Sequence, residues 1–325
     1  MKIVPNKQQK KAVIESVKWL KSGYKQVFEI SGPPGSGKTF IVYLIRKAMK
    51  LNPLDVLFMA YVGKATMALT LQGNNAKTMH SSIYDRVDLP KMDENGKFIL
   101  KNGRILTTPG FVKKKSLPDN IKLIVVDEGS MINEKYALDI LSFKLPVLVL
   151  GDLNQLFPIF GKPYFLRQPD IILTEIMRQA KDDPIIHLSQ KAINGEIIEI
   201  GKYGDRCFVI NKEDITDNML TKTDIVICGK NKTRDHINKY VREEIYKIDK
   251  PYPVKGEKLI CRQNNWDMSV DEGKIFLVNG LVGYVEETHL DTYNKRSLCI
   301  DFRPEFLKET CFERVAIDSF MSHVA

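Results

Sequence analysis

Short apolar runs recur along the first half of the chain, and segments with helical spacing separate them. The runs at residues 27–30, 55–60, 121–126 and 146–150 are largely apolar and β-prone. Runs of this kind are typical of strands that a sheet buries on both sides. Residues 40–49, just after the first run, predict a buried helix. Strands that alternate with helices predict a parallel α/β sheet with helices on both faces.

A further helix is predicted ahead of the first strand, from residue 6 to about residue 21. Its expected buried face consists of Ala12, Val13, Ile14, Val17 and Leu20. Gln9 lies near the start of this helix, and its amide can hydrogen-bond both edges of an adenine because it donates and accepts. Taken alone, Gln9 fits an ordinary surface glutamine better.

Residues 84–118 interrupt the alternation of strands and helices. Turn signals at residues 93–97 and 101–104 flank a short apolar stretch, and three lysines close the segment at residues 113–115. We expect a small β-rich insertion with a basic flank. A lysine run of this length is more often a solvated edge than a binding site.

Composition and charge narrow the class of protein. The 325 residues are 43% hydrophobic and 27% charged, with 49 Lys and Arg against 40 Asp and Glu. The net charge of +9 slightly favours a polyanionic partner. The five cysteines are widely spaced with no C-x-x-C pair, which argues against a zinc site or a disulfide framework. Without a signal core or a long apolar run, a cytoplasmic location is expected, in a bacterial or phage-infected cell.

A glycine-rich loop follows the first predicted strand and precedes the helix. Its residues are Gly32, Pro33, Pro34, Gly35, Ser36, Gly37, Lys38 and Thr39. This is the G-x-x-x-x-G-K-[S/T] phosphate-binding pattern, in the strand–turn–helix context that it requires. Backbone N–H groups and the helix N-terminus attract phosphate. Lys38 can reach the β- and γ-phosphates, and the Thr39 hydroxyl can bind Mg²⁺.

Two carboxylates end the third buried run. Asp127 is placed to hold the Mg²⁺ that Thr39 also contacts, and Glu128 can orient and deprotonate an attacking water. Gln155 follows the fourth run and can sense the γ-phosphate. Arg178 follows a further predicted strand that begins at residue 171, and an arginine there can stabilise charge during phosphoryl transfer.

Polar residues after the second run are candidates for a ligand rim, because ligands collect at the carboxyl ends of parallel strands. Tyr61, Lys64, Thr78 and His80 fall at that edge. For His80, a hydrogen-bonded turn residue is the simpler interpretation, favoured about two to one on spacing alone.

The order of these blocks resembles superfamily 1 helicases of the RecD/Dda-like group, and the GDxxQLxP block is the most specific of them. The matching residues are residue 9 and residues 32–39, 60–65, 78–81, 127–130, 151–158 and 173–179. Residues 224–238 look like the opening strand and helix of a second motor domain. Residues 258–265 and 278–285 resemble a small SH3-like barrel.

The resemblance implies a domain plan for the whole chain. Residues 1–180 would form a RecA-like motor domain, with the insertion at about 84–118 as a pin that splits the duplex. Residues 181–250 would begin a second RecA-like domain, 251–315 would be the SH3-like barrel, and 316–325 would return to the second domain.

The resemblance also implies ATP hydrolysis coupled to 5′-to-3′ movement on single-stranded DNA, with ATP and Mg²⁺ as cofactors. The implied nucleotide contacts are Gln9, Gly32, Pro33, Pro34, Gly35, Ser36, Gly37, Lys38, Thr39 and Phe40. The implied catalytic residues are Lys38, Glu128, Gln155 and Arg178. Thr39 and Asp127 are the implied ligands of the Mg²⁺ ion. The implied DNA contacts are Tyr61, Lys64, Thr78, His80, Phe98, Lys230 and Asn231. Packing inside the insertion is an equal alternative for Phe98. Implied partners are single-stranded or tailed duplex DNA, proteins of replication, recombination or repair, and no membrane.

Two departures from the family pattern keep a second hypothesis open. Gly129 stands where the family usually has another small residue, and the family's H-x-S-Q-G block and second arginine segment have no match here. The alternative is therefore a nucleotide-gated module that binds single-stranded DNA and has little activity unless a C-terminal fragment completes it. A P-loop kinase or GTPase is a weaker interpretation because of GDxxQLxP.

Overall fold

The computed structural model divides by its internal contacts into two units, Met1–Lys181 and Asp182–Ala325. Each unit is described by itself. The described residues are 4–61, 63–94, 96–101, 104–158, 161–175, 183–262, 265–270, 275–277, 279–291, 296–305 and 307–317.

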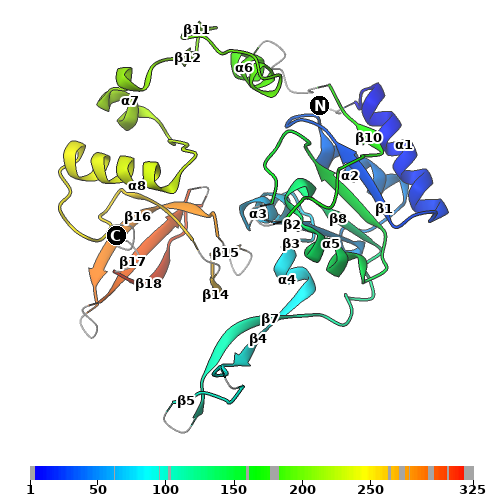
Figure 1. Cartoon of the computed structure of the whole chain (residues 1–325), viewed down its shortest axis with the longest axis horizontal. Helices are drawn as coiled ribbons and strands as arrows, with labels where there is room; N and C mark the ends of the chain where they lie inside the picture. Colours follow the sequence, from blue (N-terminus) through cyan, green and yellow to red (C-terminus); the bar gives the residue numbers. More distant parts are fainter. Residues whose placement is uncertain are drawn as a thin grey trace. The chain divides into compact units, whose positions relative to one another are not determined.

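A six-stranded parallel sheet forms the centre of the first unit (Figure 1). Its strands are β1 (Val27–Ser31), β2 (Val56–Ala60), β3 (Ala76–Thr78), β8 (Leu123–Val126), β9 (Val147–Gly151) and β10 (Ile171–Ile172). Their order is β10-β1-β9-β8-β2-β3, and neighbouring strands pair in parallel. The predicted parallel α/β sheet with a P-loop is confirmed. The strand predicted from residue 171 toward Arg178 is only two residues long.

Helices cover both faces of this sheet, because successive strand residues point to opposite sides. Leu123 and Val125 of β8 join one core cluster, and Ile124 and Val126 join the other. The first cluster includes side chains of α1 (Lys7–Ser22), α2 (Lys38–Ala48) and α3 (Gly63–Leu71). The second includes side chains of α4 (Met79–Ile83) and α5 (Glu134–Leu141). Short 3-10 turns, η1 (Pro53–Asp55) and η2 (Gly129–Met131), lie before β2 and after β8.

The predicted buried face of α1 is partly wrong. The residues that α1 buries are Gln9, Ala12, Ser16 and Trp19, at spacings of three and four, and Val13, Val17 and Leu20 pack at the edge of this stripe. Ile14 is 53% exposed. The position of this buried stripe is set by Trp19, whose ring stacks on Phe28 of β1 with 5.3 Å between the ring centroids. A large aromatic side chain sets the rotation of the helix more strongly than one isoleucine.

The insertion is a β-rich arm that leaves the sheet at α4. β4 (Tyr84–Pro90) and β7 (Thr107–Lys113) pair antiparallel along their length. β5 (Leu100–Lys101) and β6 (Arg104–Ile105) form a second short pair, and Figure 1 shows β5 at the far end of the arm. The β-rich character predicted for residues 84–118 is confirmed, and a pin function stays a prediction.

The first part of the second unit contains helices and one hairpin. Its elements are α6 (Pro184–Ile193), β11 (Gly201–Tyr203), β12 (Cys207–Val209), η3 (Lys212–Asp214), α7 (Asp217–Lys222), α8 (Asn231–Tyr240) and the π-helical turn η4 (Val241–Ile245). The predicted strand at the start of residues 224–238 is wrong, whereas the helix after it is present. Within the described residues no neighbouring strand pairs with residues 224–228, and an extended segment without a partner forms no ladder.

The second part of this unit is antiparallel β structure. β13 (Lys258–Ile260), β16 (Val282–Leu290), β17 (Ser297–Pro304) and β18 (Cys311–Ala316) form one sheet. β14 (Asn265–Val270) and β15 (Ile275–Leu277) form a separate pair. Among the described residues no pairing closes these strands into a barrel, so the SH3-like barrel stays a prediction, as does the second RecA-like domain. The predicted return at residues 316–325 lies mostly outside the described residues.

Candidate functional site

The phosphate loop links β1 to α2 at the carboxyl edge of the sheet. The Gly32 N–H donates to the carbonyl of Gly151 at the end of β9, with an N–O distance of 3.0 Å. Gly37 caps α2 with φ of 84°. The positive φ of Gly37 favours glycine there, and a Cβ would lie 2.4 Å from Nε2 of Gln9 and force that amide to shift.

Lys38 lies among three carboxylates. Its Nζ donates to the carbonyls of Gly32 at 2.6 Å and Pro33 at 3.2 Å. Burial lowers the pKa of Lys38, while the nearby charges of Glu128, Asp127 and Asp152 act in the opposite direction. The structure therefore places Lys38 within range of the charges of both carboxylates that the sequence singles out, directly after β8, and of a third directly after β9, while Nζ itself is bonded to loop carbonyls.

Asp127 and Glu128 form a desolvated acidic pair directly after β8. The Asp127 N–H donates to the Met59 carbonyl at 2.8 Å, and Oδ1 of Asp127 accepts from the Glu128 N–H at 3.1 Å. Burial raises the pKa of both carboxyl groups, and the charge of Asp127 raises that of Glu128 further. Glu128 also has φ of 56°. A carboxylate with a raised pKa and a left-handed backbone is typical of a functional position.

Asp152 was not among the predicted site residues. It is buried at the end of β9, its Oδ1 accepts from the Asn154 N–H at 2.9 Å, and its carbonyl accepts from the Gln155 N–H at 3.3 Å. Asp152 thus shapes the turn that carries Gln155 and adds charge near Lys38. The sequence could have identified Asp152 as a site residue, because it is the aspartate of the GDxxQLxP block.

Gln9 lies against the phosphate loop instead of at the surface. It is almost completely buried, its Nε2 donates to the Ser36 carbonyl at 2.9 Å, and its Oε1 accepts from the Asn6 N–H at 3.1 Å. The second bond belongs to the capping box of α1. Both ends of the amide are thus occupied by protein groups.

An aromatic cluster surrounds His80 where the arm joins the sheet unit. The His80 ring lies 5.1 to 6.4 Å, between centroids, from the rings of Tyr61, Tyr84, Phe111 and Tyr136. Nε2 of His80 is 3.2 Å from the hydroxyl of Tyr136. Burial, followed by the charge of Lys135, lowers the pKa of His80.

The aromatic residue of the arm that lies beside His80 is Phe111, not Phe98. Phe111 is 58% exposed and projects from β7. Phe98 forms an isolated bridge with Met92 and is 52% exposed, so it is not a buried core residue of the arm. Phe98 was singled out through the resemblance, which makes the insertion a pin, whereas Phe111 lies in β7, just ahead of the lysine run at residues 113–115.

The other predicted DNA contacts belong to different elements of the two units. The buried Thr78 hydroxyl caps α4 by accepting from the Ser81 N–H, and Lys64 is exposed in the first turn of α3. Lys230 and Asn231 are exposed at the start of α8, in the second unit. Arg178 lies outside the described residues.

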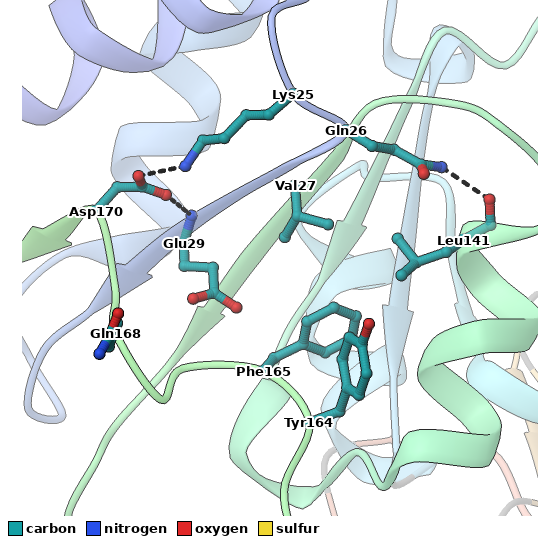
Figure 2. Close-up of a pocket in the computed structure, with 9 residues that line it drawn as sticks. All are labelled: Lys25, Gln26, Val27, Glu29, Leu141, Tyr164, Phe165, Gln168 and Asp170. Carbon is teal, nitrogen blue, oxygen red and sulfur yellow. Dashed lines mark hydrogen bonds and ion pairs between the residues drawn. The ribbon is translucent and has the colours of Figure 1, made fainter.

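A cavity of about 430 Å³ lies at the opposite, amino edge of the sheet (Figure 2). It is lined by Lys25, Gln26, Val27, Glu29, Leu141, Tyr164, Phe165, Gln168 and Asp170. Glu29 accepts from the Leu166 N–H at 2.9 Å, and Lys25 pairs with Asp170. None of the predicted site residues lines this cavity.

Within the residues described, none of the helices has the length and apolar character needed to cross a bilayer.

Comparison with known proteins places this geometry in a family. The family described as "AAA domain" matches residues 5–214, well over half of the chain. The chain is 26% identical over 302 residues to the ATP-dependent DNA helicase dda of Enterobacteria phage T4, covering 82% of this chain and 64% of that protein. It is 30% identical over 175 residues to the ATP-dependent RecD2 DNA helicase of Deinococcus radiodurans, covering 51% of this chain and 22% of that protein. The chain thus spans less than two thirds of the length of these relatives.

Among solved structures, Bacteroides Pif1 bound to ssDNA aligns with 97% of this chain and 79% of its own, at 14% identity and a TM-score of 0.49. The expected resemblance to superfamily 1 helicases of the RecD/Dda-like group is confirmed by the sequence relatives. The loop, the acidic pair and the match over residues 5–214 lead to one conclusion: the chain belongs to the AAA domain family.

Proposed function

We propose that this protein hydrolyses ATP and couples hydrolysis to movement on single-stranded DNA, in the 5′-to-3′ direction. The observation that carries the proposal is the convergence of Asp127, Glu128 and Asp152 on Lys38, beside a phosphate loop at the carboxyl edge of a parallel sheet. Such an arrangement supports phosphoryl transfer, in which positioning and electrostatic stabilisation supply most of the catalysis.

Each residue of the site has a role in this proposal. Lys38 binds the β- and γ-phosphates, and the loop from Gly32 to Thr39 surrounds them with N–H groups. Glu128 takes the proton of the attacking water, a task for which its raised pKa makes it a stronger base than an ordinary carboxylate. Gln155 links the γ-phosphate to the DNA side of the sheet, and Arg178 stabilises transferring charge.

The residues also fit a divalent cation. The Thr39 hydroxyl and the Asp127 carboxylate are hard oxygen donors of the kind that Mg²⁺ prefers, and burial of Asp127 leaves a costly charge that a cation would neutralise. When bound, the cation would supply charge stabilisation at the phosphates.

The DNA side of the proposal centres on His80 and its neighbours. Bases can stack on exposed aromatic rings, and Phe111 beside His80 supplies such a ring. The half-buried Tyr61 also lies beside His80, and Lys64 is exposed on the adjoining α3. A single-stranded or tailed duplex DNA is the proposed partner, and the cytoplasm the proposed location.

Steady-state ATPase assays with and without a single-stranded oligonucleotide, at two salt concentrations, test the proposal. We expect DNA to stimulate turnover, and Lys38→Ala to lower it by about 10²- to 10³-fold. Lys21→Ala, an exposed lysine in the last turn of α1, is the matched control and should behave as wild type. Turnover that survives Lys38→Ala would contradict the proposal, and unwinding of 5′- against 3′-tailed duplexes tests direction.

A second candidate is a nucleotide-gated DNA-binding module that needs another polypeptide to turn over ATP. It is favoured by the exposed apolar residues between 183 and 250, where α6, α7 and α8 bury none of their side chains. DNA binding without stimulated ATPase, followed by recovery of ATPase on adding a polypeptide with the H-x-S-Q-G block, would support it. No gain on mixing would count against it.

A further inference from the structure

Side chains at the start of α1 hydrogen-bond to the backbone at residues 174–175, just after β10. Oε1 of Gln8 accepts from the N–H groups of Thr174 at 2.9 Å and Glu175 at 3.2 Å, and Nε2 of Gln8 donates to the Thr174 hydroxyl at 2.7 Å. Nδ2 of Asn6 donates to the Glu175 carboxylate at 2.7 Å. One amide side chain therefore makes three hydrogen bonds to a segment more than 160 residues away in the chain.

That segment supports the front end of the phosphate loop. The Leu173 N–H donates to the Ser31 carbonyl at 2.8 Å, and Leu173 is buried in the core beneath α1 and α2. A Cβ built on Gly32 would lie only 2.8 Å from Cβ of Leu173 and 3.2 Å from its carbonyl oxygen. The backbone at Leu173 thus sets how far Gly32 can move outward.

The same turn of α1 also contacts the far end of the loop. Gln9 donates to the Ser36 carbonyl at 2.9 Å and lies where a Cβ on Gly37 would have to be. Gln8 and Gln9 are adjacent, so one turn of helix restrains the loop from both ends. The capping box between Asn6 and Gln9 keeps this turn helical.

We propose that Gln8 is a positioning residue for the phosphate loop, acting through Leu173, Thr174 and Glu175. This proposal rests on the proposed ATP-binding function. It gives Gln8 a role in binding the phosphates and none in recognising the adenine base. Loss of Gln8 would release the 174–175 backbone, let Leu173 shift away from Gly32, and widen the loop for the triphosphate.

Competition binding separates this role from two alternatives. The assay measures displacement of a fluorescent ATP analogue from the full chain, with Mg²⁺ present, by ATP, ADP and inorganic tripolyphosphate. For Gln8→Ala we expect all three affinities to fall by the same factor, roughly 3- to 10-fold. The matched control is Gln72→Ala, an exposed glutamine after α3 whose backbone N–H donates to the Leu69 carbonyl, and it should bind as wild type.

Thermal melts of the same proteins complete the test, with an expected Tm difference between the two variants of no more than about 2 °C. A loss confined to ATP and ADP would assign Gln8 to the base and overturn the proposal. Unchanged binding with a lowered Tm would mean that the Gln8 contact only stabilises the fold, and this result would also overturn the proposal.

The proposed function fails by a different result. If the wild-type chain neither binds nor hydrolyses ATP, both proposals fall together. If Lys38→Ala abolishes hydrolysis while Gln8→Ala binds all three ligands normally, only the role of Gln8 is wrong.

Discussion

The parallel sheet of the first unit and the helices of residues 183–250 contain similar apolar side chains, yet they bury them very differently. Every residue of β8 and β9 is buried, whereas α6, α7 and α8 have no buried residue. Leu148 of β9 is fully buried, and Ile227 is 87% exposed. Hydrophobic composition alone therefore does not decide burial, because a side chain is buried only where neighbouring elements pack over it.

This difference determines which functional side chains are held in place. Asp127 and Asp152 directly follow buried strands, so the core fixes the backbone that carries them. Lys230 and Asn231 begin a helix that buries nothing within the described residues. The candidate nucleotide site is therefore built into the fold, whereas the candidate DNA contacts of the second unit gain no positioning from burial.

The largest expected effect tests burial directly. Leu148→Ala should lower the free energy of unfolding by about 2–5 kcal/mol, because it leaves a cavity between β9 and the helices. Ile227→Ala should change it by less than about 0.5 kcal/mol. Urea denaturation followed by circular dichroism measures both. Equal losses would mean that Ile227 is covered in solution, which would remove the contrast between the two regions.

The next largest expected effect on stability comes from comparing alanine substitutions at two glycines, Gly129 and Gly229. A Cβ on Gly129 would lie 2.3 Å from Cγ1 of Val149, whereas a Cβ on Gly229 meets no atom within 4 Å. Overpacking at such a distance costs about 1–3 kcal/mol, so Gly129→Ala should be destabilised by that amount and Gly229→Ala should not. The same denaturation assay applies. A wild-type midpoint for Gly129→Ala would show that β9 relaxes more easily than its burial implies.

The sequence predicts the sheet well, together with the position of the glycine loop and the strand-end acids at one edge of it, because local patterns carry all three. Long apolar runs, a glycine loop and strand-end acids need no knowledge of distant contacts. Ile14 was misplaced because the rotation of α1 depends on Trp19 packing against Phe28, which belongs to another element. Phe98 stays a prediction, and the contact of Phe111 with His80 joins residues far apart in the chain. The strand predicted at residues 224–228 failed for the same reason, since a strand exists only with a partner beside it.

The contrast between the two regions can also be tested by DNA binding. The comparison is between the losses of affinity caused by alanine at Phe111 of the first unit and at Lys230 of the second. If bases stack on Phe111 beside His80, Phe111→Ala should weaken binding of a single-stranded oligonucleotide by about 5- to 100-fold. Phe98→Ala, equally exposed but away from His80, is the matched control and should lose less. Lys230→Ala should weaken binding less than Phe111→Ala and should reduce the slope of log K against log salt by roughly 0.7. Fluorescence anisotropy at several salt concentrations measures all three.

A reversed order, with Lys230 dominant, would mean that the second unit holds the DNA more firmly than its lack of burial suggests.

The smallest effect concerns a carboxylate at the other edge of the buried sheet. Burial, more than any nearby charge, raises the pKa of Glu29, so its ionised form is disfavoured in the folded state. The stability that protonated Glu29 contributes is complete below about pH 4 and is lost as the pH rises through the raised pKa. Glu29→Gln is neutral at every pH, and its amide oxygen can still accept from the Leu166 N–H.

Glu29→Gln should therefore raise the Tm by about 1–2 °C at pH 7, and the gain should disappear near pH 4. The effect is small because water reaches part of this carboxyl and screens it. The control is Glu213→Gln, an exposed carboxylate in η3 of the second unit, with an expected Tm close to wild type at pH 7. A gain of the same size at pH 4 would have to come from packing, because the raised pKa of Glu29 favours its neutral form as the pH falls.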